Sequence, residues 1–204
     1  MRNASHPIIR IGVVGTGRIA VRFVPEAKYV SGVMVNSVYN PKIESAKEFG
    51  DQFELDLATD DFNAFMKEVD AIYIASPHQT HYEYAKRALE QGKHVLCEKP
   101  LAFKRAEAEE LFTIAREHGV VLLEAIKTAY CPGFVQLVGI AKSGVIGQIC
   151  DVEACFTRLT DPGLRERTDV AYGGGFTEFG SHTLLPIMKL MGTNYKEVRS
   201  EERR

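Results

Sequence analysis

A glycine-rich segment after the first apolar run of the chain carries the strongest chemical signal. Residues 15–20 read Gly-Thr-Gly-Arg-Ile-Ala, between the apolar run at 8–14 and a predicted helix. Glycines there permit a tight turn and a close approach of the backbone, and the amino end of the helix faces a diphosphate. Ala20 takes the third glycine position, which needs only a small residue. The pattern predicts a dinucleotide site; the alternative is a glycine-rich turn that binds no nucleotide.

The end of the second predicted strand bears on the choice between NAD and NADP. NAD sites usually place Asp or Glu there to bind the ribose 2′-hydroxyl. This sequence reads Val-Tyr-Asn-Pro-Lys over 38–42 and has no acid before Glu44. Without a carboxylate a 2′-phosphate is not repelled, and Lys42 can attract it. The pattern favours NADP and leaves NAD open, because Asn40 can hydrogen-bond to either cofactor.

A lysine follows another short strand, in the segment Cys97-Glu98-Lys99-Pro100. Ligands of open parallel sheets bind at the carboxyl ends of the strands. A lysine placed there, beside a nicotinamide, can orient a substrate hydroxyl or accept its proton while hydride leaves the carbon. The alternative is an ordinary surface lysine.

Alternating strand and helix signals place these segments. Strands are predicted at 8–14, 33–39, 71–75, 95–97 and 120–126, with helices between them that end near 28, 50, 68, 91 and 118. Thr59 or Asp60 can cap the helix over 62–68, and Gly50, Gly92 and Gly119 are predicted helix ends. This α/β pattern predicts a doubly wound, mostly parallel Rossmann sheet.

The pattern changes after residue 126, so we expect domains at 1–126 and 127–204. Helices are predicted at 132–142 and 180–191, the second with Pro186 near its start. Residues 148–159 alternate in character and predict a strand of a different sheet, and 195–200 can begin another. The polar stretch at 160–171 is predicted to be a loop.

Composition excludes several classes of protein. The chain has 204 residues, 45% hydrophobic and 25% charged, which is typical of a globular protein. A net charge of −2 provides no basic field for nucleic acid or an anionic membrane. Four cysteines without a C-x-x-C pair, and no signal-peptide profile, favour a reducing cytoplasm. His78 and His81 lack a third ligand at useful spacing, so no metal site is expected.

Three motifs in this order resemble one family. The glycine turn, Ser76-Pro77-x-x-x-His81 and Glu98-Lys99-Pro100 together resemble the glucose–fructose oxidoreductase/inositol dehydrogenase/MocA (Gfo/Idh/MocA) family. The resemblance implies an NAD(P)-dependent oxidoreductase that acts on a sugar-, inositol- or diol-like substrate. It also implies a C-terminal α+β domain with a mostly antiparallel sheet, which would be incomplete in this chain.

The resemblance assigns roles by position. It implies a diphosphate loop at Gly15, Gly17, Arg18 and Ile19, a shell beside the ribose and nicotinamide at Ser76, Pro77 and His81, and a pair near the nicotinamide at Glu98 and Lys99. Lys99 would touch the substrate oxygen, and His182 matches the family's catalytic histidine, a general base.

The second half departs from the family pattern in two residues and in length. Glu178 and Leu185 stand where the pattern has aspartates, and leucine cannot bind a substrate hydroxyl. Family members continue beyond this length, so we expect either a truncated chain or a homo-oligomer that covers the open sheet edge. The alternative function is an NAD(P)-binding module without catalysis.

Overall fold

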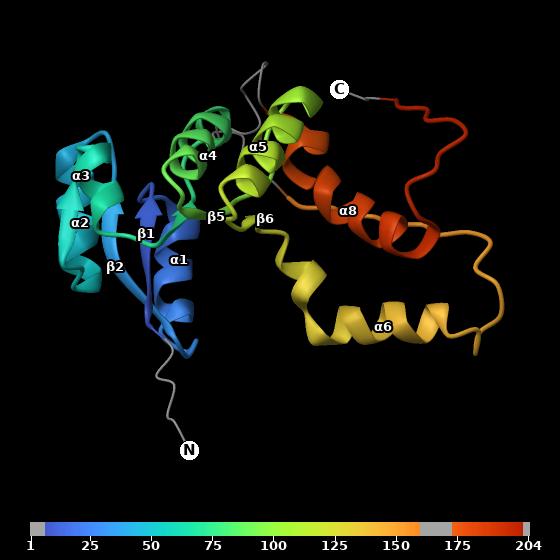
Figure 1. Ribbon diagram of the computed structural model, residues 1–204. Helices are drawn as coiled ribbons and strands as arrows, with labels where there is room; N and C mark the ends of the chain where they lie inside the picture. Colours follow the sequence, from blue (N-terminus) through green and yellow to red (C-terminus); the bar gives the residue numbers. More distant parts are fainter. Residues whose placement is uncertain (1–6, 160–172, 202–204) are drawn as a thin grey trace. The chain divides into compact units, whose positions relative to one another are not determined.

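The computed structural model describes residues 7–159 and 173–201 (Figure 1). The chain divides into two compact units, Met1–Ala125 and Ile126–Arg204. The loop predicted at 160–171 lies outside the described residues.

The first unit is built on a six-stranded sheet whose neighbouring strands all pair in parallel. Its strands are β1 (Ile9–Val14), β2 (Val33–Tyr39), β3 (Leu57–Thr59), β4 (Ala71–Ile74), β5 (His94–Cys97) and β6 (Leu122–Glu124). The spatial order β3-β2-β1-β4-β5-β6 reverses between β1 and β4. This is the Rossmann order and confirms the predicted doubly wound sheet. The sequence missed β3, whose three half-buried residues form no apolar run.

Helices cover both faces of this sheet: α1 (Arg18–Ala27), α2 (Ile43–Phe53), α3 (Phe62–Lys67), α4 (His81–Glu90) and α5 (Arg105–Glu117), with a short 3₁₀ turn η1 (His78–Thr80) before α4. Successive residues of β1 face opposite sides of the sheet, so they belong to two separate hydrophobic clusters. Val13 packs in one cluster with residues of α1 and α2, and Val14 packs in another with residues of α3, α4 and α5. The buried strands therefore read as continuous apolar runs because they contact a helix layer on each side.

Two predicted helix signals were wrong in detail. Gly50 does not end α2, which continues to Phe53 and ends at Glu54 in the left-handed conformation (φ 57°). A larger residue does not fit at position 50, because a Cβ there would lie 2.8 Å from the Cβ of Ala58 in β3. The cap of α3 is Asp61, not Thr59 or Asp60, since its carboxylate accepts hydrogen bonds from two first-turn N–H groups. Gly92 and Gly119 do follow helix ends, with positive φ, as predicted.

The second unit contains a short 3₁₀ turn η2 (Lys127–Tyr130) and the helices α6 (Pro132–Lys142) and α8 (Gly175–Met191) among its described residues. Helix α6 has the predicted bounds. Helix α8 begins five residues before Gly180, at Gly175, so Pro186 lies inside the helix rather than in its first turn. Pro186 has no N–H to donate to the carbonyl of His182, which removes one helical hydrogen bond.

The strands predicted at 148–159 and 195–200 are not formed, and the described part of the second unit contains no sheet. A strand needs a neighbour for its backbone N–H and C=O groups, and alternation along one segment does not supply one. The expected antiparallel sheet is therefore absent from residues 126–159 and 173–201.

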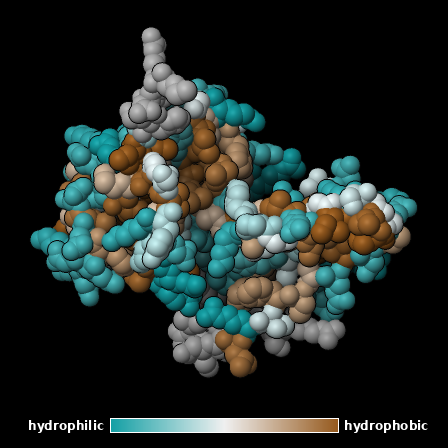
Figure 2. Space-filling model, turned by 90° about the horizontal axis from the view of Figure 1, so that it is seen from below, coloured by the Kyte–Doolittle hydropathy of each residue, from teal (hydrophilic) through white to brown (hydrophobic). Residues whose placement is uncertain are grey.

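Apolar surface remains open on both units. Figure 2 shows hydrophobic patches on the face that it draws. In the second unit, α6 and the turn after it expose Val135, Leu137, Ile140, Val145 and Ile146. None of the helices in the described part of the chain is both long enough and apolar enough to cross a membrane.

Candidate active site

The carboxyl edge of the sheet gathers the predicted segments of the first unit. Backbone hydrogen bonds link the residue after each strand to the neighbouring strand: Gly15 N–H to the carbonyl of Tyr39 (2.9 Å), Ala75 N–H to Val14 (2.9 Å) and Glu98 N–H to Ile74 (2.9 Å). The segments that follow β1, β4 and β5 therefore start at one edge, beside the switch point between β1 and β4 where ligands of such sheets bind.

The glycine segment forms an uncapped helix start. Gly15 has φ +99°, and a Cβ there would lie 2.8 Å from the carbonyl oxygen of Ala75. Gly17 is the N-cap of α1; no side chain caps the helix, and its first turn has no acid. A Cβ at Gly17 would meet nothing within 4 Å, and Arg18 and Ile19 are exposed. The first-turn N–H groups have no helical acceptor, so the segment fits an anionic diphosphate.

Asn40 links the glycine segment to the turn after β2. Its Nδ2 donates to Oγ1 of Thr16 (2.8 Å), and its Oδ1 accepts the backbone N–H of Lys42 (2.9 Å). The amide thus has partners at both ends within the protein. Lys42 is exposed and precedes α2. Of the two residues, Lys42 has the side chain that extends toward solvent at this end of the edge.

The segment after β4 is held by hydroxyl groups. Oγ1 of Thr80 donates to the carbonyl of Pro77 (2.7 Å) and lies 2.7 Å from Oγ of Ser76. Since the one hydroxyl proton of Thr80 is used, Ser76 donates to Thr80. Sequence reasoning selected Ser76 and Pro77 but missed Thr80, whose only signal was its place three residues after Pro77.

His81 lies beneath this edge, with 0% of its surface exposed. Its Nδ1 is 2.8 Å from the carbonyl oxygen of Pro100, and its Nε2 is 3.0 Å from that of Ser76. Burial lowers the pKa of His81, an effect that the two carbonyls and Glu98 oppose. A ring that contacts main-chain atoms through both nitrogens can serve a cofactor site by holding the loops around it.

Glu98 and Lys99 follow β5 and are both half-buried. The hydroxyl of Tyr73, in β4, donates to Oε1 of Glu98 (2.7 Å). Burial, with the charge of Glu98 second, raises the pKa of Tyr73 well above its usual value, so Tyr73 remains a donor. Sequence reasoning missed Tyr73, because it read the strand at 71–75 only as a buried apolar run. The peptide bond between Lys99 and Pro100 is cis.

His182 lies in α8 of the second unit, against an aromatic side chain. Its ring stacks on Phe156, with centroids 5.4 Å apart, and Phe156 stacks in turn on Phe179 at 4.8 Å. Next to it, Oγ of Ser181 is buried without a hydrogen-bond partner. Glu178 and Leu185 are both half-buried in the same helix. The half-buried imidazole has one face covered by Phe156.

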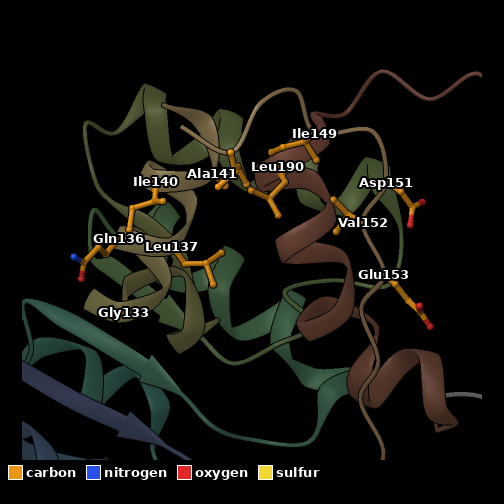
Figure 3. Close-up of a pocket in the computed structure, with 11 residues that line it drawn as sticks. Gly133, Gln136, Leu137, Ile140, Ala141, Ile149, Asp151, Val152, Glu153 and Leu190 are labelled. Atoms are coloured by element: carbon orange, nitrogen blue, oxygen red, sulfur yellow. The ribbon is translucent and has the colours of Figure 1, made fainter. Parts of the chain in front are cut away.

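A separate cavity of about 640 Å³ lies within the second unit (Figure 3). Its apolar lining includes Leu137, Ile140 and Leu190, whereas Gln136, Asp151 and Glu153 direct their polar ends away from it. Binding sites need a few convergent polar groups, and this cavity contains no predicted site residue. Among residues 7–159 and 173–201, no group of three His, Cys, Asp or Glu side chains could hold a metal ion.

Comparison with known proteins identifies a family whose model covers the sheet that forms this edge. The family model of Gfo/Idh/MocA, described as an oxidoreductase family with an NAD-binding Rossmann fold, matches residues 9–126. Scyllo-inositol 2-dehydrogenase (NADP⁺) IolU of Bacillus subtilis is 39% identical over 132 residues, which cover 64% of this chain and 40% of that protein. A dTDP-3,4-didehydro-2,6-dideoxy-α-D-glucose 3-reductase of Actinomadura kijaniata is 33% identical over 195 residues, 93% of this chain and 58% of that protein.

Two solved structures that hold NADP or NAD are similar to this chain. The 3-ketoreductase KijD10 of Actinomadura kijaniata, in complex with NADP and TDP-benzene, superposes with a TM-score of 0.81 at 34% identity, covering 91% of this chain and 58% of that one. GenD2 of gentamicin A biosynthesis, in complex with NAD, has a TM-score of 0.82 at 24% identity, a likeness of fold alone. The chain spans about half the length of these proteins.

Proposed function

Because the chain belongs to the Gfo/Idh/MocA family of oxidoreductases with an NAD-binding Rossmann fold, we propose that it binds NAD(P) at the carboxyl edge of its sheet. We further propose that it transfers hydride between the nicotinamide and a secondary alcohol or ketone of a sugar-, inositol- or diol-like substrate. The observation that carries the proposal is the uncapped start of α1 beside Gly15 and Gly17, at the same edge as Glu98 and Lys99.

Different residues of the first unit bind different parts of the cofactor. The first-turn N–H groups of α1, at Gly17, Arg18 and Ile19, hold the diphosphate, and Gly15 keeps the backbone close to β4. When bound, the nicotinamide gives or takes the hydride. Ser76 and Pro77 line its ribose side, and His81 supports them from below. Glu98 and Lys99 border the ring.

Two ionisable side chains handle the substrate's oxygen and proton. The Lys99 ammonium donates a hydrogen bond to the substrate oxygen and polarises it. His182 accepts the hydroxyl proton as hydride leaves the carbon, or returns it in the reverse direction. The Phe156 ring restricts the orientation of the imidazole.

NADP is the better fit of the two cofactors. The turn after β2 offers Lys42 and no carboxylate before Glu44, and the Asn40 amide already holds Thr16 and the Lys42 N–H. A 2′-phosphate would therefore meet the cation of Lys42 and no carboxylate between Tyr39 and Lys42. The names of two relatives point the same way, since IolU is an NADP⁺ dehydrogenase and KijD10 was solved with NADP.

The names of the relatives and the residues of α8 support this substrate class. The relatives act, by name, on scyllo-inositol and on a dTDP-linked keto sugar. Leu185 supplies no hydrogen bond, so this part of α8 suits a substrate that lacks one of the hydroxyls of a full polyol. A deoxy sugar or a cyclic diol meets that condition.

Two measurements test the proposal. NADH and NADPH are titrated against the protein by calorimetry, and polyols and keto sugars are then screened for turnover. Lys99→Met should lower kcat by about 10²–10⁴-fold and leave the cofactor Kd largely unchanged. Lys104→Met, an exposed lysine paired with Glu107, serves as the control. No binding of either nucleotide would refute the proposal, and tight binding without turnover would favour a non-catalytic NAD(P)-binding module.

A further inference from the structure

Tyr73 holds the carboxylate that precedes Lys99. Its side chain is 3% exposed, and its ring stacks on Phe23 of α1 at 3.8 Å between centroids. A buried hydroxyl needs an acceptor, and Oε1 of Glu98 provides it at 2.7 Å. A hydrogen bond to a charged acceptor is among the stronger ones in a protein. Glu98 therefore has one oxygen fixed from within the sheet.

His81 holds the carbonyl that follows Lys99. Its buried ring lies between the carbonyl oxygens of Pro100 (2.8 Å) and Ser76 (3.0 Å). A neutral imidazole carries one N–H, so the ring can donate to only one of these two oxygens at a time. The segments after β4 and β5 thus both contact the same side chain, and its removal would take away the contact that they share.

Glu124, the last residue of β6, holds the chain just beyond. Its Oε1 accepts the backbone N–H of Leu101 (2.9 Å). The next residue, Ala125, donates its N–H to the carbonyl of Cys97 (2.7 Å). The end of β6 therefore binds the chain both before and after the turn that contains Lys99.

We infer that Tyr73, His81 and Glu124 form a positioning frame around Lys99, in which Tyr73 holds the side chain of Glu98 before it and the other two hold the backbone after it. The three side chains come from β4, α4 and β6 and reach residues 98, 100 and 101. In this proposal they act through Lys99 and Glu98, as positioning residues, and not by contact with substrate or cofactor. This inference rests on the proposed function, because it gives the frame the task of aiming Lys99 at the nicotinamide half of the cofactor.

The frame predicts an effect confined to one half of the dinucleotide. The adenosine and diphosphate half would contact the glycine segment and the turn after β2, where none of the three frame hydrogen bonds lies. Weakening the frame should therefore reduce the affinity for NADPH and leave the affinity for 2′-phospho-ADP-ribose, which lacks nicotinamide, unchanged. A loss of general stability would reduce both.

Tyr73→Phe is the sharpest variant, since it removes one hydroxyl and keeps the ring on Phe23. Tyr82→Phe is the matched control: Tyr82 follows His81 in α4 and also donates to a glutamate, Glu110 of α5 (2.7 Å), but it makes none of the three frame hydrogen bonds. Calorimetry on the full chain should show the Kd for NADPH raised roughly 2- to 10-fold by Tyr73→Phe, with the Kd for 2′-phospho-ADP-ribose unchanged. Tyr82→Phe should change neither.

His81 gives a second, independent variant. His81→Gln keeps an amide donor beside the carbonyls, and His81→Leu has none, so NADPH affinity should fall further in the leucine variant. Where a substrate is turned over, Tyr73→Phe should lower kcat more than it changes KM. Equal losses for the two ligands, or no loss, would overturn the frame alone. A wild-type chain that binds neither ligand would overturn the proposed function and the frame with it.

Discussion

The two units of the chain use their apolar residues in opposite ways. Among the described residues, every buried hydrophobic side chain lies between 13 and 122, in the first unit. Helix α6 buries no residue, and α8 buries only Gly180. The first unit thus completes its own core on both faces of a sheet, whereas the described helices of the second leave apolar surface open.

The candidate polar groups differ in the same way. At the carboxyl edge of the sheet, Ser76, His81 and Glu98 each have a partner within the first unit. In the second unit, Oγ of Ser181 beside His182 is buried without one. The cofactor half of the proposed site is therefore pre-organised by its own sheet. The substrate half depends on a helix that packs little apolar surface.

The largest effect is expected at the glycine segment, where two neighbouring glycines should respond differently. Gly15→Ala forces a Cβ to within 2.8 Å of the Ala75 carbonyl oxygen at φ +99°, and should cost about 1–3 kcal/mol of stability and abolish cofactor binding. Gly17→Ser places its Cβ in open space and can cap α1, so stability should hold or rise. Its hydroxyl, however, competes for the N–H groups that hold the diphosphate.

Thermal unfolding and calorimetric titration with NADPH separate the two effects. The Gly17→Ser variant should lose roughly tenfold or more in affinity while its melting temperature is at least that of the wild type. Unchanged NADPH affinity in Gly17→Ser would show that the edge does not hold a diphosphate through α1.

A smaller effect compares one helical glycine from each unit. Gly50 of α2 is buried, and a Cβ there would lie 2.8 Å from that of Ala58, so Gly50→Ala should destabilise the protein by about 1–3 kcal/mol. Gly139 of α6 is exposed with nothing within 4 Å, so Gly139→Ala should stabilise its helix by up to about 1 kcal/mol. Chemical denaturation measures both. Destabilisation by Gly139→Ala would mean that α6 is packed more closely than this structure describes.

Gly50 illustrates which features of the fold could be predicted from the sequence and which could not. The parallel, doubly wound sheet, α6 and the helix-ending Gly92 and Gly119 followed from local patterns, because strand runs, Pro132 and positive-φ glycines act through neighbouring residues. Gly50 acts through Ala58, a contact that no local pattern encodes. The strand β3 was not predicted for the same reason, because its three residues gain their conformation from pairing with β2.

The same distinction between local patterns and distant contacts applies to the residues of the candidate site. The segments at 15–20, 76–81 and 98–100 could be found from motif and family resemblance, and their shared edge follows from the sheet. Tyr73 and Glu124 could not, because each acts through a hydrogen bond to a segment that is distant in the chain. In the second unit, alternation at 148–159 predicted a strand that the described residues do not form, since pairing requires a partner strand.

The smallest effect concerns pH and tests how firmly the first unit buries His81. Burial lowers the pKa of His81 below the ordinary value of 6.5. As pH falls below about 6.5, the unfolded chain takes up a proton that the folded chain binds less readily, so the free energy of unfolding should decrease. The slope from this one group is at most about 1.4 kcal/mol per pH unit. More than about one pH unit above 6.5 it contributes almost no slope, because neither state then binds the proton.

His81→Gln cannot titrate and should flatten this part of the stability curve. Urea unfolding between pH 7.5 and 5 measures this slope. Carboxylates begin to protonate below that range; for example, the hydrogen bond from Arg10 lowers the pKa of Asp70. His118→Gln, an exposed histidine at the end of α5, should retain the wild-type slope. If His81→Gln and the wild type lose stability in parallel, the ring accepts its proton within the fold. In that case both carbonyls, of Ser76 and Pro100, are bound by N–H groups of an imidazolium rather than one by a neutral ring.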